Sequence, residues 1–164
     1  MRKIAVTVVL LLLATPLLFA SQKYVQKDGL FKIDIPDGWR GQEISGGLLI
    51  VPPPSSGGGI VIQFRRVDAK DTPDEIKRKI NSSLASMFES RIQPAGGSII
   101  DNKEIIAGGA FGKCLYYKAP LKGELMYFFR AILVNKGHAL TIDYGSSSKE
   151  QTDKILSLIQ ALEF

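Results

Sequence analysis

Residue types that often carry chemistry are scarce in this sequence. Its 164 residues include one cysteine (Cys114), one histidine (His138) and one tryptophan (Trp39). A single cysteine excludes an internal disulfide, so the folded chain depends on a hydrophobic core, which a chain of this length can build. A lone histidine cannot form a typical zinc site without cysteine or carboxylate ligands at suitable spacing, and the sequence offers none. We therefore predict no metal and no cofactor.

Motifs of common catalytic sites are also missing. There is no Gly-x-Ser-x-Gly pattern for a nucleophilic serine, and the glycines at 57–59 lack the lysine and Ser/Thr of a phosphate-binding loop. We therefore expect no catalytic residue and no enzymatic activity, and a hydrolase that uses His138 is the most remote function considered. Cys114 shares a strand face with Tyr116, which favours a buried thiol over a reactive or intermolecularly bonded one.

The positive charge of the chain is mild. The whole sequence carries a formal net charge of +5, and loss of Arg2 and Lys3 with the N-terminal segment would leave +3. This permits weak contact with an anionic membrane surface or an acidic partner. It falls short of the basic stripe that nucleic-acid binding requires, so we expect no nucleic-acid partner.

The first twenty residues have the layout of a secretory signal peptide. Arg2 and Lys3 precede an uncharged apolar run at 4–13, Pro16 interrupts the apolar helix, and Ala20 supplies a small residue for cleavage. We predict cleavage after Ala20.

This layout divides the chain into a signal peptide at 1–20 and a single domain at 21–164, exported to the periplasm or the extracellular space. The alternative is an uncleaved membrane anchor, because the uncharged stretch at 4–21 nearly reaches the roughly 20 residues of a membrane span. In both cases most of the chain leaves the cytoplasm.

Alternating apolar and polar residues predict a series of strands. Phe31, Ile33 and Ile35 point to one side of a strand that ends in a Pro-Asp-Gly turn, and the Pro/Gly-rich segment 52–59 joins two others as an exposed loop. The segment 124–135 is apolar on both faces, which indicates a strand covered on both sides. Strands are expected at 24–27, 30–35, 48–51, 60–67, 98–106, 111–119, 124–135 and 138–144.

Two capped helices complete the pattern. Thr72, Pro73 and Glu75 form a capping box with proline at the first helical position, followed by an apolar stripe. Ser147 and Glu150 predict a second capping box near the C-terminus. The two stripes comprise Ile76, Ile80, Leu84, Met87 and Phe88, and Ile155, Leu158, Ile159 and Leu162. The expected fold class is α+β, with an antiparallel sheet covered by helices on both faces, an α/β/α sandwich.

The order of these elements resembles the PsbP-like and DcrB-like superfamily. The resemblance is carried by "FKIDIPDGW", the proline-glycine loop between two strands, the capped mid-chain helix, "HALTIDYGSS" and the closing helix "EQTDKILSLIQALEF". It implies an α/β/α sandwich and a role as an accessory or binding protein, without a shared catalytic residue. The positions that correspond are structural: Phe31, Ile33, Ile35, Pro36, Trp39, Ile155, Leu158, Ile159, Leu162 and Phe164.

Three functions follow from these observations, in order of preference. The first is an exported, non-enzymatic accessory or binding protein of the cell envelope that contacts another protein or assembly. Its candidate partner surface comprises Trp39, Pro53, Gly58, Arg65 and Arg66. Trp39 is interpreted mainly as a structural plug at the end of the sheet, with ligand stacking as the alternative. The second function is a small-molecule or lipid carrier, and the third is the hydrolase.

Overall fold

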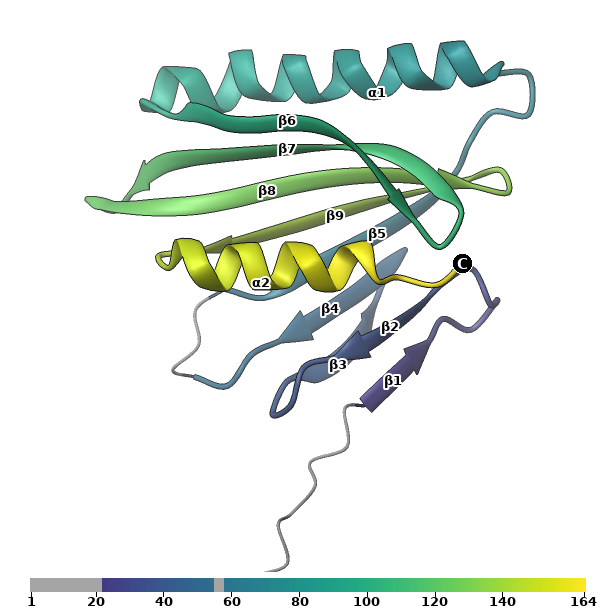
Figure 1. The fold of residues 1–164 in the computed structure, drawn as a ribbon, viewed down its shortest axis with the longest axis horizontal. Helices are drawn as coiled ribbons and strands as arrows, with labels where there is room; N and C mark the ends of the chain where they lie inside the picture. Colours follow the sequence, from purple (N-terminus) through teal and green to yellow (C-terminus); the bar gives the residue numbers. More distant parts are fainter. Residues whose placement is uncertain (1–21, 55–57) are drawn as a thin grey trace, which may run out of the picture.

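A large antiparallel sheet dominates the fold. The computed structural model describes residues 22–54 and 58–164, and the predicted signal peptide at 1–20 lies outside them. Among the described residues, one sheet has the strand order β3-β4-β5-β9-β8-β7-β6, and β1 pairs with β2 in a separate hairpin (Figure 1). The strands are β1 (Gln22–Val25), β2 (Lys32–Ile35), β3 (Arg40–Ile44), β4 (Gly47–Val51), β5 (Ile60–Arg66), β6 (Ser98–Ala107), β7 (Ala110–Leu121), β8 (Glu124–Asn135) and β9 (His138–Ser146).

Two α-helices complete this mixed α+β fold: α1 (Pro73–Met87) follows β5, and α2 (Lys149–Gln160) follows β9. After α1 the chain continues through a π-helical turn (Phe88–Ile92) and a short 3-10 helix (Gln93–Ala95) before β6. Neither α-helix in the described residues combines the length and the apolarity that crossing a bilayer would need.

The capping box at the start of α1 forms as predicted. The Thr72 hydroxyl accepts a hydrogen bond from the Glu75 backbone N–H, and the Glu75 carboxylate accepts one from the Thr72 backbone N–H. The predicted N-cap of α2 is wrong by one residue, because Ser148 rather than Ser147 caps the helix and accepts from the Gln151 backbone N–H. The sequence has a serine at both positions, so the pattern alone could not choose between them. The Ser148 backbone N–H donates to the Ser146 hydroxyl, which differs from the predicted capping box.

Strand β3 was not expected from the sequence. Its residues, Arg-Gly-Gln-Glu-Ile, are almost all exposed and show no apolar alternation. It forms because the chain turns back at Gly46 and pairs antiparallel with the largely buried β4, which places β3 at the edge of the sheet. An edge strand of this kind has little hydrophobic signal of its own.

Buried apolar side chains form two clusters. The main core joins the β1–β2 hairpin, the sheet and α2, with Phe129, Ala131 and Leu133 as its β8 members and Ile155 and Ile159 as α2 members. The small core joins α1 to the sheet and contains Ile80, Leu84, Leu115, Ile132, Val134 and Ala139. Successive residues of β8 thus alternate between the two clusters, as residues on opposite sides of a strand do.

Candidate functional site

A surface groove runs between α1 and strand β5. It consists of two adjoining hollows of about 190 and 410 Å³ that share Arg65, Ser83 and Ile132 in their walls. We call it the α1 groove. Its α1 wall comprises Ile76, Lys79, Ile80 and Ser83, and its β5 wall comprises Gln63, Phe64, Arg65 and Arg66. The floor comprises Arg130, Ile132, Val134, Ala139 and Thr141.

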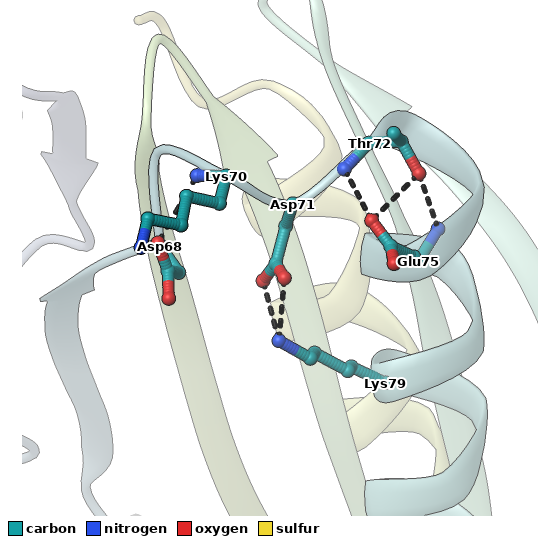
Figure 2. Close-up of polar contacts among 6 residues, drawn as sticks. All are labelled: Asp68, Lys70, Asp71, Thr72, Glu75 and Lys79. Atoms are coloured by element: carbon teal, nitrogen blue, oxygen red, sulfur yellow. Dashed lines mark hydrogen bonds and ion pairs between the residues drawn. The ribbon is translucent and has the colours of Figure 1, made fainter.

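The connection from β5 to α1 is fixed by local polar contacts, which Figure 2 shows. The Lys79 ammonium donates to both carboxylate oxygens of Asp71 at 2.6 Å, which ties the second turn of α1 to the preceding loop. The Asp68 carboxylate accepts a hydrogen bond from the Lys70 backbone N–H at 3.0 Å. Hydrogen bonds from Thr72 hold the pKa of the Glu75 carboxyl below its ordinary value, so this cap is anionic at neutral pH.

An ion pair between neighbouring strands lies at the floor of the groove. Arg130 of β8 and Asp143 of β9 are opposite each other in register, and the guanidinium donates to both carboxylate oxygens at 2.6 and 2.8 Å. The hydrogen bonds to Asp143 raise the pKa of Arg130 above its ordinary value. This half-buried bidentate pair holds the Arg130 charge in one position.

Arg65 and Arg66 differ from the other cations of the groove. Both side chains are exposed, and no ion pair formed within residues 22–54 and 58–164 involves either of them. Arg65 lies in the wall of both hollows, and Arg66 lies in the wall of one. Arg65 lies opposite Ala139 of the small core and therefore on the α1 face of β5, so its guanidinium is the charge that a bound molecule can use without breaking an existing pair.

A second groove, the Trp39 groove, lies beside α2. It has a volume of about 600 Å³, and its apolar lining comes mainly from Pro36, Trp39, Ile155 and Leu158. Trp39 is half-buried, packs against the main core and lies in tilted contact with Tyr144 at 6.4 Å between ring centroids. The ring therefore covers the core with one part and lines the groove with another. The polar lining of this groove is mixed in charge: Asp37, Ser148, Glu150, Gln151 and Lys154.

The structure does not bring the five predicted partner-surface residues together. Arg65 and Arg66 end strand β5 and line the α1 groove, whereas Trp39 lines the other groove. Pro53 lies near the turn before Trp39, because a Cβ on Gly38 would approach the Pro53 ring at 3.4 Å. Gly58 lies at the opposite end of β5 from Arg65, beside the backbone of Gly145.

Sequence reasoning missed several polar contributors to the α1 groove, among them Ser83, Arg130 and Thr141. Ser83 is one of several serines on α1, and Arg130 and Thr141 lie in long apolar strands. An Arg in the doubly apolar segment 124–135 was a signal, because a charge within such a strand usually has a partner. Identifying Asp143 as that partner required the register of β8 and β9.

The residues considered for catalysis do not form a cluster. His138 follows the β8–β9 turn, and its Nδ1 lies 3.2 Å from the Lys136 carbonyl oxygen. Cys114 is buried in the main core, as expected, and this burial raises the pKa of its thiol to about 12. No group of three or more His, Cys, Asp or Glu side chains that could hold a metal is found in the part of the chain that the structure describes.

Comparison with solved structures identifies the fold. The chain is similar to the cyanobacterial PsbP protein of Synechocystis, with a TM-score of 0.64 and 14% identity over 88% of this chain and 92% of that one. It is similar to LpqN of Mycobacterium tuberculosis, a protein described as involved in cell envelope biogenesis, with a TM-score of 0.61 and 14% identity over 87% of this chain and 89% of that one.

A protein of Bacteroides thetaiotaomicron is also similar, with a TM-score of 0.63 and 14% identity over 87% of this chain and 48% of that one. No family model and no curated protein matches the sequence. The likeness at this level of identity is one of fold, and it confirms the PsbP-like fold that the order of elements indicated.

Proposed function

From the premise that the chain has the PsbP-like fold, we propose that it is an exported, non-enzymatic accessory protein of the cell envelope that works by contacting another protein. The described neighbours with this fold include a PsbP protein and a protein involved in cell envelope biogenesis. We propose a cell-envelope location for this chain as well, with residues 1–20 as its signal peptide and 21–164 as one domain.

One observation carries the proposal. The α1 groove combines apolar residues in its floor and walls with two exposed arginines that form no ion pair among the described residues. A fold that only had to be stable would gain little from leaving these groups beside an open hollow. Grooves with a few well-placed polar groups on apolar walls are typical of binding surfaces.

The proposed architecture places one helix on each face of the sheet. It is supported by the alternation of β8, whose Ala131 and Leu133 belong to the cluster with α2 and whose Ile132 and Val134 belong to the cluster with α1. In this arrangement the α1 groove and the Trp39 groove open on opposite faces. A partner that occupies one of them leaves the other free.

The second candidate is a carrier of a small apolar molecule, and the Trp39 groove favours it. Its volume of about 600 Å³ falls within the range of ligand pockets, and Trp39 offers a face for stacking. A melting shift of the wild-type chain, but not of Trp39→Ala, across a panel of lipids and metabolites would support this candidate. Native mass spectrometry without a bound ligand, together with no shift in the panel, would exclude it.

The proposed function is tested by photo-crosslinking in cells that express the full chain. A photoreactive amino acid is placed at Ser83 in the α1 groove, at Lys154 in the Trp39 groove, and at Ser157, an exposed α2 position outside the lining of both grooves. We expect a discrete adduct with one envelope protein from a groove position and none from Ser157. Absence of any adduct from all three positions across growth conditions would overturn the proposal.

A further inference from the structure

We infer that the α1 groove binds an acidic, partly apolar segment of the partner protein, with the Arg65 guanidinium as its main anchor. The inference rests on the proposed function, because it names the chemistry of the partner that the proposed function requires. It assigns the contact to the α1 groove rather than to the Trp39 groove.

The first step is the balance of charge in the groove. Two carboxylates are paired with cations, Asp71 with Lys79 and Asp143 with Arg130. Asp68 accepts only a backbone N–H and keeps its negative charge against the two arginines. Arg65 and Arg66 have no ion-pair partner among the described residues. The charge left to a bound molecule is positive, and a carboxylate can accept two parallel hydrogen bonds from one guanidinium.

The second step is the apolar floor. Ile132, Val134 and Ala139 lie beside these charges, and all three are buried members of the small core. The half-buried Val67 and Ile76 line the same hollow and expose apolar surface that a molecule carrying only negative charge would leave uncovered. A segment in which Asp or Glu residues alternate with apolar residues places carboxylates against the arginines of the β5 wall and apolar side chains against the apolar lining.

The third step is how the segment is held. Strand β5 is paired on both sides along 61–63, with β4 and with β9, whereas at Arg65 and Arg66 only β9 pairs with it. We expect side chains to make most of the contacts, because Gln63, Ser83 and Thr141 line the groove with amide and hydroxyl groups. This distinguishes the proposed mode from strand addition at a sheet edge.

The Trp39 groove is less complementary in charge to an acidic segment than the α1 groove is. Its lining contains two carboxylates, Asp37 and Glu150, against one ammonium, Lys154. An acidic segment would be repelled there, and like charges brought together at an interface are costly. Charge complementarity therefore favours the α1 groove for an acidic partner.

The test is selection from a phage-displayed library of random 12-residue peptides against the immobilised full-length protein. We expect the selected peptides to be enriched in Asp and Glu interspersed with apolar residues, and to bind more weakly as salt is added. Arg65→Glu should weaken the selected peptides by about tenfold or more. The matched control is Arg40→Glu, another exposed strand arginine, which should leave binding unchanged.

Several results would overturn the inference: no enrichment, enrichment of basic or neutral peptides, or acidic peptides that bind Arg65→Glu as well as wild type. Thermal melts of both variants check that they fold. Co-sedimentation with phosphatidylglycerol vesicles that depends on Arg65, without peptide binding, would assign the groove to a membrane surface instead. If a crosslinked partner is found at Ser83 but its contact segment is not acidic, the inference fails while the proposed function stands.

Discussion

The two buried clusters of the fold differ in size and in closure. Among the described residues the main core contains 22 buried side chains and is enclosed by the β1–β2 hairpin and α2. The small core contains six and is covered mainly by α1, with Val67 and Phe88 beside it. The floor of the α1 groove borders the small core, whose Ile132, Val134 and Ala139 lie buried beneath it. The difference indicates that stability resides mainly in the main core and that the α1 side is free to serve as a contact surface.

The largest effect is expected in the main core. Phe129 of β8 is 1% exposed, and its ring packs against the ring of Tyr144. Phe129→Ala leaves a cavity, and we expect it to lower the free energy of unfolding by about 3–5 kcal/mol. Urea denaturation measures this change. A loss below about 1 kcal/mol would mean that the main core does not dominate stability.

A smaller effect is expected in the small core. Leu84 is 2% exposed and is one of the two fully buried positions of α1. Leu84→Ala should cost about 2–3 kcal/mol, near the lower end for a buried leucine, because the small core can relax toward the open groove. Hydrogen exchange should show faster exchange in α1 and unchanged exchange in α2. Equal loosening of both helices would contradict the comparison.

The cap of α1 should have a moderate effect that depends on pH. Thr72→Ala should cost about 1 kcal/mol at pH 7. The pKa of Glu75 is lowered in the folded state, so its contribution is present above its ordinary value of 4.5 and is lost as the pH falls through the lower folded value. We therefore expect the difference between Thr72→Ala and wild type to shrink in acid. A difference that grows in acid would show that the pKa shift has the opposite sign.

The smallest perturbation is chemical labelling of the Cys114 thiol. Cys114 is 1% exposed within the main core, and burial raises the pKa of its thiol to about 12. A thiol reagent at pH 8 should therefore react with the folded protein far more slowly than with the protein in concentrated urea, which is the control. Equal rates in the two states would show that the main core opens readily.

Features with local signals were predictable from the sequence. The alternation of Phe31, Ile33 and Ile35 predicted strand β2 and its buried face, with Phe31 buried just before the strand begins. Thr72 and Glu75 predicted the start of α1. The edge strand β3 carries no apolar alternation, so it was missed. The α1 groove depends on side chains from α1, β5, β8 and β9, and only the register of the sheet brings these together.

The central claim is that a partner occupies the α1 groove, and hydrogen–deuterium exchange of the protein with and without a selected acidic peptide tests it most directly. The account predicts slower exchange in the segments 63–71 and 76–83, with no change at 148–158 along the Trp39 groove. Slower exchange at 148–158 with the α1 segments unchanged would contradict it.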